Sequence, residues 1–109
     1  MSYETVYKAI IAFAAKGTYT TPANSAHNVT TSTSAILAAN SNRLYAVIVN
    51  DSDVVIYLGI GANAVLNQGV RINANGGAYE INWTNLYTGA INGIHGGTGN
   101  KVVTVFEGD

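Results

Sequence analysis

Residues 36–57, ILAANSNRLYAVIVNDSDVVIY, decide the fold class of this chain. They contain two apolar runs, LYAVIV (44–49) and VVIYL (54–58), which are rich in β-branched and aromatic side chains and therefore favour β-strands. The polar residues 50–53, NDSD, separate the runs, so the pattern predicts a β-hairpin. We expect this hairpin to form the centre of an all-β domain.

The rest of the chain also reads as short strands separated by glycine and asparagine turns. GVRI (69–72) and AYEIN (78–82) flank the turn NANGG (73–77), in which Asn75 and Gly76 suit positive φ angles. Gly59 and Gly61 read as a bulge or a wide turn between strands. The glycine-rich residues 95–100 read as a hairpin turn before a closing strand over 101–107, of which both faces should be at least partly covered.

Before the central pattern, the predicted strands are more polar. Pro22 lacks a backbone N–H, so residues 20–25 should form a loop or an edge. Residues 27–34 then read as a polar strand and 35–38 as an apolar one. About eight short strands in all predict a compact antiparallel β-sandwich or jelly roll over residues 17–109, because one open sheet would leave a face and its edges in water.

The first sixteen residues differ from the rest, and we expect them to form an N-terminal arm or a short helix. Alanines and helical spacing of apolar residues favour a helix, while alternation of apolar side chains fits a strand or an extended arm equally well. The segment either reaches a partner subunit or closes the protein's own core. In the first case its apolar and aromatic side chains would bind the partner: Tyr3, Tyr7, Ile11 and Phe13.

The composition excludes several classes of function. Only 10% of residues are charged, against about a quarter in an average soluble domain, and the net charge is −1. Five Lys and Arg residues do not make a phosphate-neutralising stripe, so nucleic acid is not an expected partner. No run approaches the ~20 apolar residues of a membrane-spanning helix, and the N-terminus is a poor secretory signal. We expect synthesis in a cytoplasm and a subunit role in an assembly, because an uncharged surface is easily desolvated.

Two glycine motifs resemble nucleotide sites but fail on context. GIGANA (59–64) follows a strand, yet residues 65–80 are broken by glycines where the pyrophosphate-binding helix should begin. GGTGNK (96–101) has Asn100 between the glycine and the lysine, and a strand follows it. We therefore predict no nucleotide cofactor.

Catalytic and metal-ligating residues are equally scarce. The chain has no cysteine and two histidines, so thiolate chemistry and cysteine zinc sites are excluded. Asp51 and Asp53 lack the further oxygen ligands of a calcium loop. Only Glu80 and Glu107 are candidates for a pair of catalytic carboxylates on rigid strands. We predict that the protein is not an enzyme and holds no metal or other cofactor.

Two aromatic residues in the C-terminal half are candidates for partner binding. Trp83 reads as a core residue or as an anchor between subunits, and Tyr87 follows it in the segment LYTGAINGI (86–94). Both also suit a receptor- or carbohydrate-binding module.

The order of the segments over residues 35–109 resembles a family of small virion proteins of tailed bacteriophages. The resemblance lies in the Asn-Arg pair at 42–43, the segments YLG (57–59), GGAYE (76–80) and YTGAI (87–91), and the closing VVTVFE. It implies a small β-sandwich similar to capsid decoration, or cement, proteins. The resemblance does not extend to the N-terminal third, about which it implies nothing.

The resemblance, together with the composition, gives two functional expectations. The first is a capsid decoration protein on the virion surface, which binds the lattice of the major capsid protein, stabilises the head and forms a homo-oligomer, either a dimer or a trimer. The alternative is a receptor- or carbohydrate-binding module associated with a tail or spike.

Overall fold

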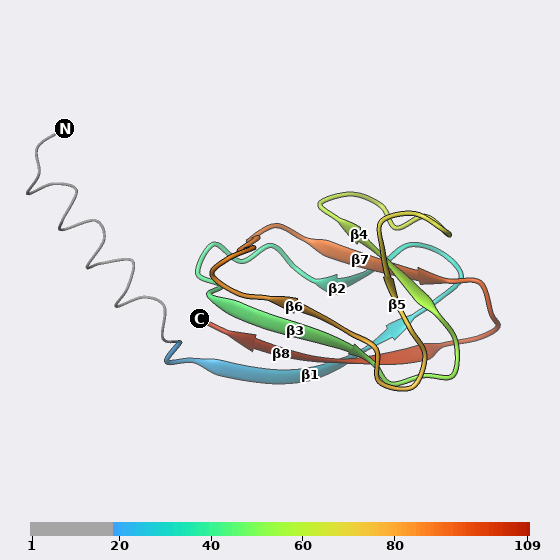
Figure 1. Cartoon of the computed structure of the whole chain (residues 1–109), viewed down its shortest axis with the longest axis horizontal. Coiled ribbons are helices and arrows are strands. Elements are labelled where there is room, and N and C mark those ends of the chain that lie inside the picture. Colours follow the sequence, from blue (N-terminus) through green and yellow to red (C-terminus); the bar gives the residue numbers. More distant parts are fainter. Residues whose placement is uncertain (1–18) are drawn as a thin grey trace, which may run out of the picture.

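The computed structural model describes residues 19–109 and shows an antiparallel β-sandwich of two four-stranded sheets (Figure 1). The prediction of an all-β sandwich is confirmed. The predicted arm or helix at residues 1–16 lies outside the described residues.

The two sheets are named here by their order along the chain. The first sheet has the order β1-β8-β3-β6 and the second has the order β2-β7-β4-β5. The strands of the first sheet are β1 (Pro22–Val29), β8 (Lys101–Gly108), β3 (Tyr45–Asn50) and β6 (Ala78–Ile81). Those of the second sheet are β2 (Ser34–Leu37), β7 (Ile91–His95), β4 (Ile56–Ile60) and β5 (Val70–Ile72).

The core lies between the sheets and takes alternate residues of the interior strands of the first sheet, as the two-residue period of a strand requires. In β3, Ala46 and Ile48 are fully buried, and in the neighbouring β8 Val103 and Val105 lie on the same side of the sheet. The other core residues are aliphatic side chains from the remaining strands: Val29, Ile36, Leu37, Ile56, Leu58, Ile72, Ile81 and Ile91.

The predicted central hairpin is wrong, because β3 and β4 lie in different sheets. β3 pairs with β8 and β6, whereas β4 pairs with β7 and β5. Asn50 explains why the chain crosses between the layers here. Its buried side chain donates to the carbonyls of Val54 and Ile72 and accepts from the backbone and hydroxyl of Ser52. Each apolar run thus becomes an interior strand of its own sheet.

The turn over 73–77 has the predicted backbone but also connects different sheets. Asn75 and Gly76 have φ angles of 58° and 108°. The turn packs against the β3–β4 connection, where the N–H of Gly76 donates to the carbonyl of Asn50.

The predicted hairpin turn over 95–100 is likewise wrong, since β7 and β8 lie in different sheets. There buried His95 orients the loop, because its Nδ1 accepts from the N–H of Gly97 while Nε2 bonds the carbonyl of Gly99.

The chain is arranged as one long hairpin folded over on itself. β1 pairs with β8, β2 with β7, β3 with β6 and β4 with β5. β4 and β5 are the only consecutive strands that pair within the described part, and residues 61–69 join them.

The predicted wide turn therefore begins at Gly61 (φ 72°), while Gly59 lies inside β4. The polar strand spans Pro22–Val29 instead of 27–34, with Pro22 at the start of an edge, as expected for proline.

Candidate protein-binding surface

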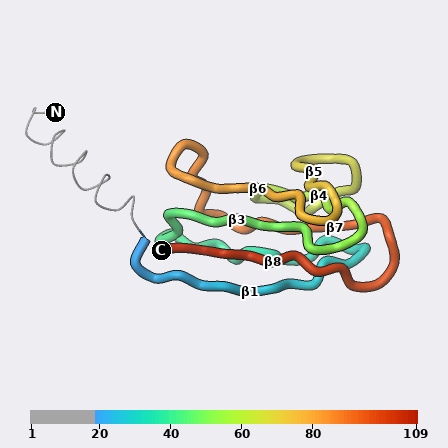
Figure 2. The backbone as a smooth tube through the Cα atoms, turned by 60° about the horizontal axis from the view of Figure 1, so that its bottom comes forward, coloured from blue at the N-terminus to red at the C-terminus, as the bar shows by residue number. Residues whose placement is uncertain are grey.

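The side of the first sheet that faces away from the core is apolar on its two interior strands. We call this side the outer face. Figure 2 brings it to the front, where β6, β3, β8 and β1 lie in order and no described strand covers them. The strand register places these residues on it: Asn24, Ala26, Asn28, Tyr45, Val47, Val49, Ala78, Glu80, Val102, Thr104 and Phe106.

A shallow groove of about 370 Å³ runs over the outer face across β1, β8 and β3. Val47, Val49, Thr104 and Phe106 line it. Among the strand residues that the register directs to this face, Glu80 on the edge strand β6 is the only charged one. The middle of the face therefore offers apolar area without a charge that a partner would have to desolvate.

Three aromatic rings cover one end of the outer face. The ring of Phe106 lies 5.3 Å from that of Tyr19 and 5.9 Å from that of Tyr45, both within the range of attractive aromatic pairs. Tyr19 lies over Gly108, where any side chain would collide with its ring. The chain thus enters the described structure across this face.

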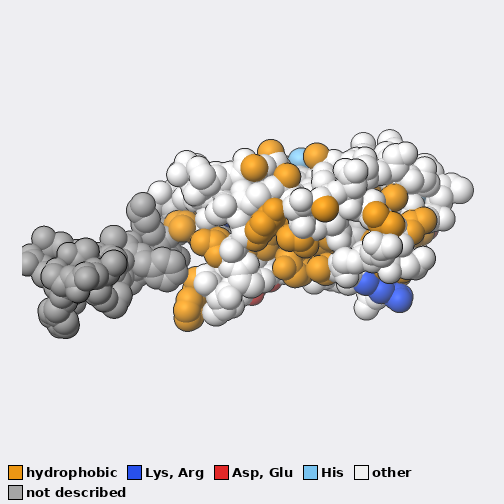
Figure 3. All heavy atoms as spheres, turned by 90° about the horizontal axis from the view of Figure 1, so that it is seen from above, with side chains coloured by type: hydrophobic (Ala, Val, Ile, Leu, Met, Phe, Trp, Pro, Cys, Tyr) orange, Lys and Arg blue, Asp and Glu red, His pale blue; other side chains and the backbone are white. Residues whose placement is uncertain are grey.

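The second sheet differs because its own loop covers part of it. Residues 61–69 fold back over β4, so that a side chain at Gly59 would meet the backbone of Ala62 and Asn63 within 2.7 Å. Asn92 donates to the carbonyl of Ala62 and holds the loop down. Seen from the side of β4 and β7, hydrophobic side chains gather over the middle of the molecule (Figure 3), and the loop itself exposes Val65.

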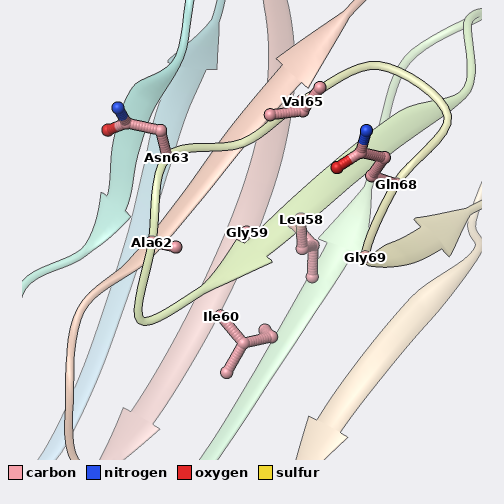
Figure 4. A pocket seen from close by; sticks show the side chains of 8 residues that line it. All are labelled: Leu58, Gly59, Ile60, Ala62, Asn63, Val65, Gln68 and Gly69. Carbon is pink, nitrogen blue, oxygen red and sulfur yellow. The ribbon is translucent and has the colours of Figure 1, made fainter.

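A cavity of about 280 Å³ lies between this loop and β4 (Figure 4). Its lining consists of backbone, apolar side chains and the amides of Asn63 and Gln68. None of the lining residues is an acid, a base or a nucleophile, so the cavity has no group for acid–base or covalent catalysis.

The loop between β6 and β7 presents Trp83, the most exposed large hydrophobic residue of the described chain, with 71% of its surface accessible. The alternative that Trp83 lies in the core is therefore wrong. Hydrogen bonds fix the loop: Asn82 accepts from the N–H of Thr84, and Asn85 accepts from the N–H of Asn82 and donates to the carbonyl of Glu80. The indole is held outward by an ordered turn.

Glu80 connects this loop to the aromatic end of the outer face. Its carboxylate accepts from the Tyr45 hydroxyl at 2.6 Å and from the Asn82 amide at 2.9 Å. The Tyr45 hydrogen bond, followed by that from Asn82, lowers the pKa of Glu80, and the bond to Glu80 raises the pKa of Tyr45. Both groups are exposed, so the pair orders the surface more than it stabilises the fold.

Arg43 fixes the other end of the same loop from inside the protein. Its side chain is fully buried, and its Nε donates to Glu107 at 2.6 Å. The remaining guanidinium nitrogens donate to the carbonyls of Ala38, Tyr87 and Gly89. One planar side chain thus joins three segments, a geometry that the rigid fork of arginine suits.

The two carboxylates considered for catalysis do not share a cleft. Glu80 is opposite Val47 and faces outward, whereas Glu107 is opposite Ala46 and faces the interior toward Arg43. Within residues 19–109, no three His, Asp or Glu side chains lie close enough together to hold a metal ion.

The predicted partner-binding residues fall into three groups. Tyr3, Tyr7, Ile11 and Phe13 lie outside the described residues. Trp83 is exposed, as partner binding requires. Tyr87 is half-buried and packs against the core, with its hydroxyl beside Gly61 and Gly89, so its role in partner binding stays a prediction.

Sequence reasoning expected both faces of the closing strand over 101–107 to be at least partly covered, but it did not identify the outer face as a surface. LYAVIV and VVTVF are apolar at nearly every position, and such runs indicate strands that are covered on both faces. Within the described residues no strand covers the outer side, and Val102 is exposed there. The same reasoning missed the internal role of Arg43, for which one arginine between two apolar runs gives no signal.

Neither protein-family models, curated proteins nor solved structures match this chain. The part of the chain that the structure describes contains no helix long and apolar enough to cross a membrane.

Proposed function

We propose that this protein is a non-enzymatic structural subunit, a bacteriophage capsid decoration protein that binds the lattice of the major capsid protein and stabilises the head. The outer face of the first sheet is the observation that carries the proposal. It is apolar in the middle and no described strand covers it, although its two interior strands, β3 and β8, have the sequence of strands covered on both sides.

The strand order supports the same class of function. We infer a jelly roll from two sheets ordered 1-8-3-6 and 2-7-4-5, in which the chain pairs as a folded long hairpin. Jelly rolls are common in viral capsid proteins and also in lectins. This is an analogy at the level of the fold, so it supports a virion role without identifying a partner.

Binding through such a face stabilises a shell by mass action. A protein that binds the assembled lattice and not the free capsid subunit shifts the equilibrium toward the shell in proportion to its occupancy. The low charge of the chain suits this role, because little charge has to be desolvated when two coats meet.

Binding to heads that lack the protein tests the proposal. Thr104→Lys places a charge in the middle of the groove, where Thr104 is already half-exposed, and should reduce occupancy at least tenfold. Asn63→Lys is the control, since it adds the same charge to the exposed loop of the second sheet. Equal binding of the two variants, with both folded by circular dichroism, would contradict the role of the outer face.

The N-terminal segment has a separate proposed role in the same binding. Its apolar residues Tyr3, Tyr7, Ile11 and Phe13 would grip the major capsid protein or a neighbouring subunit. Deletion of residues 2–16 should abolish binding to expanded heads and leave the β-sandwich folded. Unchanged occupancy would refute this role.

The exposed indole favours a second candidate, a receptor- or carbohydrate-binding module on a tail or spike. Trp83 is held outward by an ordered turn rich in amide and hydroxyl groups, as a stacking platform for a sugar would be. A glycan array decides between the candidates: glycan binding that is lost in Trp83→Ala favours the module, and the absence of any glycan binding favours the capsid role.

A further inference from the structure

The four edge strands of the sandwich are unequal in length. β2, β5 and β6 have four, three and four residues, whereas β1 has eight. The loop after β6 also shields its edge, because Asn85 donates to the carbonyl of Glu80. Soluble proteins normally protect a long edge with lysines, other charges, prolines or a bulge. β1, with the sequence PANSAHNV, has no Lys, Arg, Asp or Glu, has a proline only at its first residue and pairs with β8 without a register shift.

The hydrogen bonds at the start of β1 show which backbone groups face away from β8. Thr21 and Asp109 exchange both of their N–H to carbonyl bonds, so they form a hydrogen-bonded pair of the antiparallel ladder. Such pairs recur every second residue, so Asn24, Ala26 and Asn28 direct their N–H and carbonyl groups outward. Pro22 belongs to the same set of even-numbered residues, so the N–H that proline lacks is not needed for pairing with β8.

We propose that β1 pairs with β1 of a second copy of this chain, antiparallel and about a two-fold axis. In this pairing the even-numbered residues of one copy lie opposite even-numbered residues of the other. The outward-directed backbone groups of the two copies therefore meet. The overlap is longest when the axis passes beside Ser25 or Ala26. The absence of formal charges from β1 means that no like charges oppose each other across the axis.

The pairing joins the two first sheets into one continuous eight-stranded sheet. The outer faces of the two copies then form a single surface with twice the apolar area. This inference deepens the proposed function by specifying a dimer and the strand through which it forms. It rests on the proposed function only where it assigns capsid binding to the enlarged outer face.

Sedimentation of the full-length protein over a range of concentrations tests the pairing. The wild type should reach twice the 11.4 kDa mass of one chain. Ala26→Pro removes one outward N–H and no bond to β8, and should weaken self-association at least tenfold. Ala26→Val, which keeps the N–H and adds similar apolar bulk, should associate as the wild type does.

A charge exchange at the same position tests the two-fold arrangement. Ala26→Lys and Ala26→Glu should each weaken self-association, because identical charges meet near the axis, and a mixture of the two variants should restore the double mass. This pair of variants retains the N–H and therefore decides the matter if Ala26→Pro fails to fold.

Three results would overturn the proposal: a wild-type monomer at every concentration, which leaves the edge to residues 1–18 or to another protein; a dimer that Ala26→Pro does not weaken; or a Lys and Glu mixture that stays monomeric. None of them bears on the binding of heads through Thr104, so failure of the pairing and failure of the proposed function are distinguishable.

Discussion

Replacement of Arg43 by methionine should be among the most destabilising single changes in the described chain. It leaves the carboxylate of Glu107, whose side chain is 19% exposed, without its partner, and it removes the donors to the carbonyls of Ala38, Tyr87 and Gly89. Removal of one partner of a buried ion pair costs about 3–5 kcal/mol. A domain of this size has about 5–15 kcal/mol of total stability, so the variant should lose about a fifth of it or more.

Urea denaturation followed by far-ultraviolet circular dichroism measures this loss. In thermal unfolding, about 3 kcal/mol corresponds to a decrease of at least about 12 °C in Tm, at ~4 °C per kcal/mol for a domain near this length. Arg71→Met is the matched control, because Arg71 is exposed on β5 and its loss should change stability by less than about 0.5 kcal/mol. A loss below about 1 kcal/mol in Arg43→Met would refute the reasoning, since it would mean that water satisfies these groups equally well.

Three further changes have expected outcomes. Tyr45→Phe removes the main hydrogen bond that lowers the pKa of Glu80, so this pKa should rise toward its usual value in an NMR titration; an unchanged titration would exclude the bond in solution. Gly69→Ala should destabilise the fold more than Gly99→Ala in thermal melts, because both have φ above 70° but only the Cβ at 69 would collide with a backbone carbonyl, that of Leu58; equal losses would contradict that contact. Trp83→Ala should leave the free energy of unfolding within about 0.5 kcal/mol of the wild type, and a larger loss would place the indole in the core.

The strands themselves could be predicted from the sequence because their cause is local. Runs such as LYAVIV and VVTVF favour strands whatever their neighbours, and Asn75 and Gly76 specify positive φ within one turn. The strand partners could not be predicted in the same way. A connection such as residues 51–55 can reverse the chain within one sheet or carry it to the other, and the deciding interaction, between Asn50 and the carbonyl of Ile72, joins residues 22 positions apart.

The candidate surface shows the same division. The apolar outward positions of β3 and β8 are visible in the sequence, but their union into one face depends on a register between residues such as Val47 and Phe106, which are far apart in the chain. The sequence left Trp83 as either a core residue or an anchor between subunits, because its exposure depends on the hydrogen bonds of Asn82 and Asn85. Residue type thus indicates which side chains could bind a partner, whereas pairing between distant segments decides which of them lie together on the surface.

β8 is an interior strand of the first sheet, although it follows all the other described strands in the sequence. β1 has β8 as its strand partner in that sheet, and β3 also requires β8, so neither is fully paired until residues 101–108 lie between them. The middle of the sheet therefore forms by pairing between segments far apart in the sequence, and such pairing is slow. Loss of β8 alone would split the first sheet and remove the outer face, so the proposed binding surface depends on a single strand.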